Sequence, residues 1–214
     1  PPALSLCSAW AALRVYKGLA VPSSARAQRD LSFCYEKIGE VEDAKGDLTG
    51  ARESYSKSLA IRENLAAADP SSASLQRDLL VSYIKIGDVE RAQGDLTGAR
   101  ESFGKSLAIS ENLAAAEPSS ADAQRDLFVS YSRIGNVEVA QGDLTGARES
   151  YSKSLAIAEN LAAADPSSAS LQRDLSSCYL HLVHIERSRR PIHRMPERTP
   201  PRSERDERQR GDER

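Results

Sequence analysis

Apolar residues recur through the middle of the chain at the spacing of an α-helix. Leu75, Leu79, Tyr83, Ile86 and Val89 are separated by four, four, three and three residues. This spacing places their side chains on one stripe of a helix, with polar residues between them. The stretch is therefore predicted to be an amphipathic helix, called helix A below.

A second helix, helix B, is predicted directly after the first. Helix A is preceded by residues 70–72, Pro-Ser-Ser, and followed by Gly94, which are typical start and stop signals. Helix B then begins at residues 95–97, Asp-Leu-Thr, where Asp or Thr can cap it, and continues through Phe103 and Leu107. Because only a few residues connect the two helices, they must pack antiparallel as a hairpin.

This hairpin pattern occurs three times. The string Gly-Asp-Leu-Thr-Gly-Ala-Arg-Glu-Ser begins at Gly46, Gly94 and Gly142, so the chain repeats itself every 48 residues. A period of this size is typical of stacked units that cannot bury their apolar faces alone, and strand signals are absent. The fold is therefore predicted to be all-α, an α-solenoid of antiparallel helix pairs. The units are residues 27–74, 75–122 and 123–170, with a terminal helix at 171–188.

The flanks complete the predicted organisation. We expect a helical flank at residues 1–24, a repeat domain at 25–188 and a disordered charged tail at 189–214, where prolines and charges leave little to bury. Each helix A also holds a glycine that costs about 1 kcal/mol relative to alanine. We expect close approach of the helix B backbone at Gly39, Gly87 and Gly135, with Ala51, Ala99 and Ala147 as the small residues opposite them.

Seven positions recur together in each unit. They are Tyr35, Ile38, Gly39, Gly46, Ala51, Tyr55 and Leu59, then Tyr83, Ile86, Gly87, Gly94, Ala99, Phe103 and Leu107, then Tyr131, Ile134, Gly135, Gly142, Ala147, Tyr151 and Leu155. In residue type and spacing this set resembles the tetratricopeptide repeat. The resemblance covers about three quarters of the chain and implies a right-handed superhelix of helix pairs.

Some positions depart from the tetratricopeptide pattern. The family period is about 34 residues, so each unit here carries roughly 14 more, or about two extra turns on each helix. Glutamates stand where the family usually has an aromatic residue, and serines where it has alanine: Glu42, Glu90 and Glu138, and Ser58, Ser106 and Ser154. We therefore expect an elongated version of the hairpin.

The resemblance implies a recognition surface on the concave side of the A helices. The units differ most clearly at three helix A positions that share one helical face, and a fourth varies beside them. We expect Ile84 and Val139 to be exposed there, which favours binding over free drift of an unconstrained surface, the alternative interpretation. The predicted groove residues are Phe33, Glu36, Glu40, Asp43, Val81, Ile84, Asp88, Arg91, Val129, Ser132, Asn136 and Val139.

The function predicted from these patterns is a non-catalytic scaffold or adaptor that binds a peptide or helix of another protein in that groove. Two alternatives stay open. The chain begins with proline, so it could be a regulatory or sensor segment of a larger signalling enzyme. Near-identical units could also stack end to end as a self-assembling structure, although we expect a monomer because the fourth unit is incomplete.

Composition narrows the functional classes. The 214 residues are 40% apolar and 28% charged, typical of a soluble folded protein. Net charge is −2, with the tail from Arg187 contributing about +4, so the repeats are acidic and present no basic face for nucleic acid. No segment is apolar enough to span a membrane. For the Arg-rich tail, the alternative to a disordered end is an arm that binds acidic surfaces or RNA.

Cysteine and histidine patterns give no site. Cys34 and Cys178 are three units apart, which is beyond disulfide reach, so a cytoplasmic location is the simpler expectation. Cys178, His181 and His184 follow metal-like spacing, but we expect both histidines to be solvated surface residues. Phosphate loops, nucleophile elbows and zinc-protease motifs are absent. We therefore predict no enzymatic activity, no catalytic residue, no metal and no cofactor.

Overall fold

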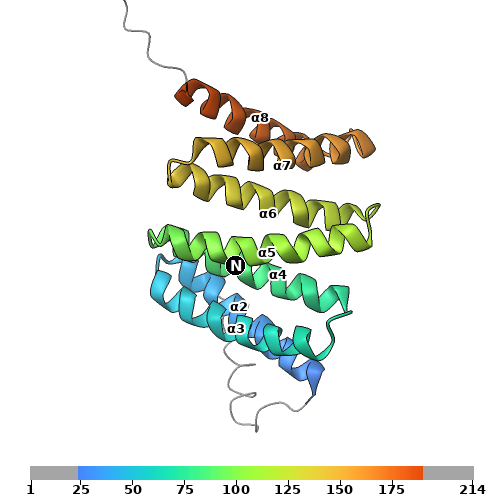
Figure 1. The fold of residues 1–214 in the computed structure, drawn as a ribbon. Helices are drawn as coiled ribbons and strands as arrows, with labels where there is room; N and C mark the ends of the chain where they lie inside the picture. Colours follow the sequence, from blue (N-terminus) through green and yellow to red (C-terminus); the bar gives the residue numbers. More distant parts are fainter. Residues whose placement is uncertain (1–23, 190–214) are drawn as a thin grey trace, which may run out of the picture.

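Helices account for almost all of residues 24–189, the part of the chain that the computed structural model describes (Figure 1). The A helices are α2 (Ala25–Ala44), α4 (Ala73–Ala92), α6 (Ala121–Ala140) and α8 (Ala169–Arg189). The B helices are α3 (Leu48–Ala68), α5 (Leu96–Ala116) and α7 (Leu144–Ala164). The all-α fold and the helix pairs are confirmed. The expected flank at 1–24 and the tail beyond Arg189 fall outside the described residues, apart from Ser24.

The helix ends form where the sequence places its polar signals. In the second unit the Ser72 hydroxyl accepts from the backbone N–H of Leu75, and the Asp95 carboxylate accepts from the N–H of Gly98 at 2.9 Å. Gly94 has a φ of +82°, the left-handed conformation that stops helix A at little cost. The same three signals recur at Ser24, Gly46 and Asp47, and at Ser120, Gly142 and Asp143.

The helices stack in chain order from α2 to α8 (Figure 1). Each helix packs against its neighbours in sequence, and α4 also contacts α6 directly. Contacts of that extent do not occur between successive B helices in residues 24–189. Ion pairs also join each helix A to the next, as between Arg29 and Asp78 and between Arg125 and Asp174, so side chains of the A helices meet along one face, called the inner face below.

The glycines inside the A helices make room for aromatic rings. A Cβ on Gly87 would lie 2.6 Å from Cε1 of Phe103, and one on Gly39 would lie 2.7 Å from the ring of Tyr55. Ala99, expected to oppose Gly87, is buried in a cluster with Val137 of the following unit. Helix B does come close at these glycines, but aromatic rings fill the space, not the helix B backbone or the predicted alanines.

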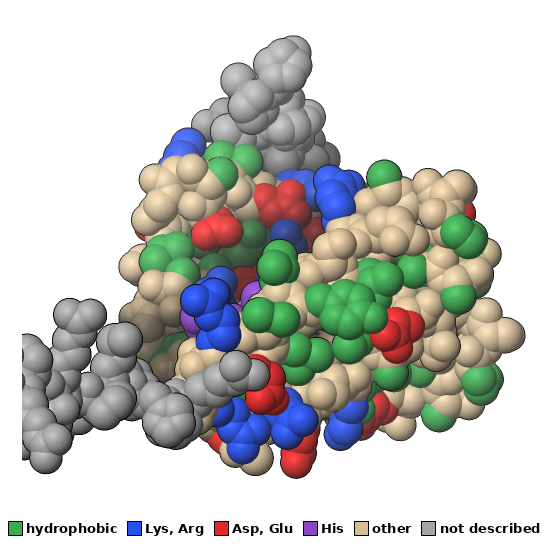
Figure 2. Space-filling model, turned by 90° about the horizontal axis from the view of Figure 1, so that it is seen from above, with side chains coloured by type: hydrophobic (Ala, Val, Ile, Leu, Met, Phe, Trp, Pro, Cys, Tyr) green, Lys and Arg blue, Asp and Glu red, His purple; other side chains and the backbone are tan. Residues whose placement is uncertain are grey.

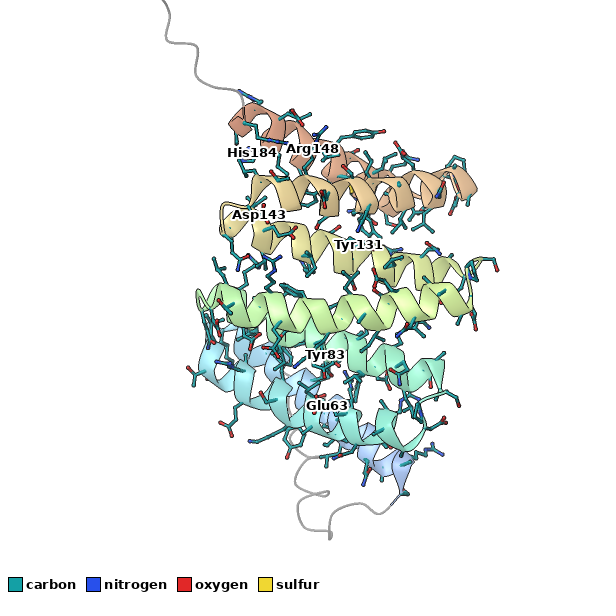
Figure 3. All side chains as sticks on the ribbon, in the orientation of Figure 1. Glu63, Tyr83, Tyr131, Asp143, Arg148 and His184 are labelled. Carbon is teal, nitrogen blue, oxygen red and sulfur yellow. The ribbon has the colours of Figure 1, made fainter. Side chains whose placement is uncertain are left out.

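Polar side chains also join one unit to the next. Arg52 lies 3.1 Å from the buried carboxylate of Glu90, which in addition accepts a hydrogen bond from the Ser102 hydroxyl at 2.7 Å. Tyr83 on α4 donates to Glu63 on α3 at 2.7 Å; both residues are labelled in Figure 3. Equivalent pairs are Arg100 with Glu138, Arg148 with Glu186, Tyr131 with Glu111 and Tyr179 with Glu159. A glutamate that departs from the tetratricopeptide pattern thus holds the units in register.

Candidate binding groove on the A helices

Ion pairs tie successive A helices together along the inner face. In one row, Arg77 of α4 lies 2.7 Å from Asp126 of α6. A second row pairs Arg133 of α6 with Asp88 of α4 at 3.2 Å. The other members are Arg29 with Asp78, Arg125 with Asp174, and Lys85 with Glu40. Most charges on this face are therefore committed to a neighbouring helix, and a partner must bind around them.

The predicted groove residues differ widely in exposure. Phe33, Asp43 and Arg91 are exposed, and the Phe33 side chain is accessible enough, at 53%, to contact a partner. Glu36 is buried at 8%. The remaining predicted residues are half-buried: Glu40, Val81, Ile84, Asp88, Val129, Ser132, Asn136 and Val139.

Ile84 and Val139 are not exposed, contrary to expectation. Ile84 packs against the buried cluster that contains Phe103, and Val139 packs against the cluster of Tyr151 and Ile185. Both side chains contribute to the core between helices. Replacing them with glutamate would therefore lower stability as well as alter the groove, so these two positions cannot test binding.

Glu36 is also not a surface residue. Its carboxylate lies 2.6 Å from the guanidinium of Arg62, which is itself 5% exposed. Arg62 was not among the residues predicted from the sequence. A signal for it exists, because the first unit has charged residues, Glu36 and Arg62, at two positions where the second unit has uncharged ones. The second unit has Ile84 and Ser110 there.

At its α2 end the groove holds three carboxylates, two of which, Glu36 and Glu40, are paired with cations. Burial, followed by the negative charges of Asp43 and Glu40, raises the pKa of Tyr55, which reports a negative potential beside its ring. Burial acts to raise the pKa of Glu40, but hydrogen bonds from Lys37 and Lys85 hold it below its usual range. Glu40 is therefore ionised and neutralised by the two lysines, whereas Asp43 remains exposed to a partner.

The α8 end of the groove holds a pocket between α6 and α8. Its volume is about 270 Å³. The pocket is lined by Phe128, Val129, Ser132, Arg133, Asn136, Asp174, Ser177, Cys178 and His181. The structure thus brings three predicted groove residues together around one cavity. Figure 2, seen from the α8 end, shows a hollow beside the histidine side chains with charged groups at its edge.

His181 has a different setting from the one expected. Its ring stacks on Tyr151 with centroids 4.5 Å apart, and it is half-buried rather than solvated. His181 and Asn136 occupy the positions that Arg133 and Asp88 hold one unit earlier, so the second row of ion pairs ends here. Burial, and then the charge of His184, lowers the pKa of His181. The ring is therefore neutral at physiological pH, and this end of the groove carries less charge.

Residues 24–189 contain no cluster of three or more His, Cys, Asp or Glu side chains that could hold a metal ion. Cys34 and Cys178 are free thiols whose pKa values are raised chiefly by burial, which makes them poor nucleophiles. Among the helices of the described part of the chain, none is both long and apolar enough to cross a bilayer.

Comparison with known proteins supports the fold. No family model matches the chain, and no curated protein matches it. Among solved structures, BtubC (BKLC) from P. vanneervenii is similar, with 16% identity, a TM-score of 0.53, and coverage of 87% of this chain and 74% of that one. MamA (17% identity, 73% and 92% coverage, TM-score 0.27) and the DHF119 filament (14%, 87% and 94%, 0.33) align more loosely and carry no argument. The similarity to BtubC shows a shared helical fold alone.

Proposed function

We propose that the chain is an elongated tetratricopeptide-like scaffold that binds a segment of another protein along the inner face of its A helices. One observation carries this proposal. Three residues predicted from differences between units, Val129, Ser132 and Asn136, line a single pocket on that face. These residues share one face of α6, and residues of α8 line the opposite side, so the varying positions border a concave site of the kind that holds ligands.

The groove's chemistry defines the partner that would fit. Asp43 is exposed at the α2 end, Phe33 offers an exposed ring nearby on the same helix, and the pocket at the α8 end is mixed apolar and polar. A suitable ligand is an extended or helical segment with basic residues toward α2 and an uncharged side chain that enters the pocket.

We further propose that the protein has no enzymatic activity and no cofactor, because its acidic and basic side chains recur in each unit as structural pairs. We propose a cytoplasmic location because the thiols of the described residues are free. The partner is a protein rather than nucleic acid, because most arginines on the inner face are paired with carboxylates.

Selection from a random peptide library displayed on phage would test the groove directly. Ser177 is an exposed residue at the edge of the pocket and makes no hydrogen bond in the described structure, so Ser177→Trp should fill the pocket without breaking a contact. We expect selected peptides to bind the wild-type chain and to bind Ser177→Trp at least tenfold more weakly.

The matched control is Ser152→Trp, because Ser152 is exposed on α7 and lies outside the pocket. This variant should bind the selected peptides like the wild type. If Ser177→Trp binds them equally well, or if both variants lose binding to the same degree, the pocket is not the recognition site and the proposal fails.

A further inference from the structure

Within residues 24–189, α8 is the one A helix that no helix B follows. Of the large apolar side chains exposed within residues 24–189, three lie on α8: Tyr179 at 48%, Leu180 at 70% and Val183 at 55%. The string that begins each helix B does not follow Arg189 in the sequence. Figure 2, which looks onto the α8 end of the stack, shows hydrophobic side chains gathered on this face. The end of the stack therefore presents a surface suited to a helix B.

The row of ion pairs between A helices ends in opposite charges. Each arginine of the row pairs with an aspartate 49 residues later, from Arg29 with Asp78 to Arg125 with Asp174. Asp30 on α2 and Arg173 on α8 continue the row at its two ends, and neither forms an ion pair within residues 24–189. A copy placed after α8 in the same repeat would bring its Asp30 to this Arg173.

The N-terminal sequence matches the missing helix B in register. Residues 22–24, Pro-Ser-Ser, precede the equivalent residues 70–72 by one period of 48. In the same register Ala3 precedes Ala51, and Leu13 precedes Ile61. In this alignment residues 1–21 occupy the helix B positions of a unit that comes before α2.

Side-chain sizes at the two ends are complementary. Val183 stands where the other A helices have a glycine, and Cys7 stands where the B helices have Tyr55, Phe103 and Tyr151. In the complete units a small residue on helix A faces a ring on helix B, as Gly87 faces Phe103. If α8 paired with residues 1–21 of another copy, a larger residue on helix A would face a smaller one on helix B. The combined volume would be kept, as close packing requires.

We propose that the chain associates head to tail with a second copy, whose N-terminal segment supplies helix B for α8. The contact is heterologous, so it leaves a free N-terminal end and a free α8 face on the assembly, and further copies can add. This assembly goes beyond groove binding and lengthens the inner face with each added copy.

Disulfide cross-linking between two different single-thiol chains tests this arrangement. The first keeps Cys7 and carries Cys34→Ser and Cys178→Ser. The second carries Cys7→Ser in addition, together with Val183→Cys. Serine already occupies the equivalent positions Ser82 and Ser130. A Cβ on Gly39 would lie 3.1 Å from Cγ of Tyr55, so thiols at the equivalent positions of the proposed contact should come within disulfide reach.

Under mild oxidation we expect a disulfide-linked heterodimer only when the two chains are mixed, and each chain alone should stay uncross-linked. Circular dichroism should first show that both chains are helical. A homodimer of the chain bearing Val183→Cys would mean that α8 packs on α8 around a two-fold axis. That result, or the absence of any cross-link with a monomer mass that is constant with concentration, would overturn the proposal.

Charge exchange provides an independent check on register. Arg173→Asp in the second chain should lower the yield of heterodimer about two- to fivefold, because the contact would lose one exposed ion pair. Asp30→Arg in the first chain should restore the yield, whereas Arg189→Asp, on the same helix as Arg173, should leave it unchanged. Failure of Asp30→Arg to rescue Arg173→Asp would show that the two ends do not meet in the proposed register.

Discussion

The junction of α2, α3 and α4 and the junction of α4, α5 and α6 share one arrangement of helices but fill it differently. In the first junction Arg62 and Glu36 form an ion pair at 2.6 Å, and both residues are buried, with exposures of 5% and 8%. In the second junction the equivalent residues are Ser110 and Ile84, and the Ser110 hydroxyl donates to a carbonyl of its own helix. The first junction is therefore polar and the second largely apolar.

Arg62 also changes how the serines of the junction are paired. In the second junction the hydroxyls of Ser106 and Ser130 are 2.9 Å apart and bond to each other. In the first junction Arg62 donates to the Ser82 hydroxyl at 2.9 Å, and the buried hydroxyl of Ser58 has no partner. Arg62 thus binds both adjacent A helices, at the cost of one unsatisfied polar group.

The difference shows that one repeat backbone accepts two kinds of core. A buried ion pair adds little net stability over an apolar pair of similar size, but losing one partner is costly because the other charge stays buried. The first unit should therefore be sensitive to single substitutions at this pair and tolerant of a double substitution that copies the second unit.

The largest effect is expected from breaking the buried pair. Arg62→Ser should lower the stability of the first unit by about 3–5 kcal/mol, because the Glu36 carboxylate would remain buried without its cation. Hydrogen exchange measured unit by unit is the suitable readout, because repeat proteins need not unfold in a single step.

The control for this prediction is the double variant Arg62→Ser with Glu36→Ile, which reproduces the second junction. It should recover most of the lost protection of α2 and α3. If the double variant is as unstable as Arg62→Ser alone, the two residues are not energetically coupled and the comparison between the junctions is wrong.

A medium effect is expected at the glycines that face the rings. Gly39→Ala and Gly87→Ala should each lower the free energy of unfolding by about 1–3 kcal/mol. The new Cβ would overlap the ring of Tyr55 or Phe103, and the cost of this overlap exceeds the gain in helix propensity. Both units should respond alike in thermal unfolding and in unit-resolved hydrogen exchange. A large difference between the two variants would show that the junctions differ in more than the Arg62 pair.

The sequence predicted the helix boundaries because capping is local. Ser72, Asp95 and Gly94 act within one turn of their own helix, so the spacing of these residues is enough. Periodicity placed the buried face of helix A only in part: Ile86 and Val89 are buried, but the fully buried Leu80 was not in the predicted stripe. It could not decide which neighbouring helix each inward side chain meets, so Ala99 was assigned to the wrong contact.

The candidate groove was predictable only in part. Variation between units located Val129, Ser132 and Asn136, which meet at one pocket. The same variation also selected Glu36 and Ile84, which vary because they fill a core. A charged residue is ordinarily assigned to the surface, and its burial depends on a partner from another helix, here Arg62, that no local pattern identifies.

A smaller effect on stability is expected when alkaline pH ionises Tyr55, the ring that faces the helix A glycine in the first unit. Burial, then the charges of Asp43 and Glu40, raises the pKa of Tyr55 above its unfolded value of about 10. The unfolded chain therefore ionises first, and stability present below pH 10 is lost as pH rises above it. Phe103 cannot contribute such a loss in the second unit.

Tyr55→Phe should accordingly make the first unit less sensitive to pH between about 9 and 11, and Phe103→Tyr should give the second unit the sensitivity it lacks. Unit-resolved hydrogen exchange, corrected for the intrinsic effect of pH on exchange, measures both. Tyr83, whose pKa is raised to about 12, is retained in both variants, so its contribution cancels in the comparison. An unchanged pH profile in Tyr55→Phe would mean that this phenol does not contribute to alkaline unfolding.

The smallest expected effect concerns the outer surface of α5. Gly104 stands where the first and third units have Ser56 and Ser152, and a Cβ there would meet no atom within 4 Å. Gly104→Ser should therefore stabilise the second unit by about 0.5 kcal/mol, because serine has the higher helix propensity and nothing obstructs it. Protection of α5 from hydrogen exchange should rise slightly while that of α3 stays constant. A loss of protection would instead indicate that this open position is covered, which would place a contact on the outer face of the second unit that the first unit lacks.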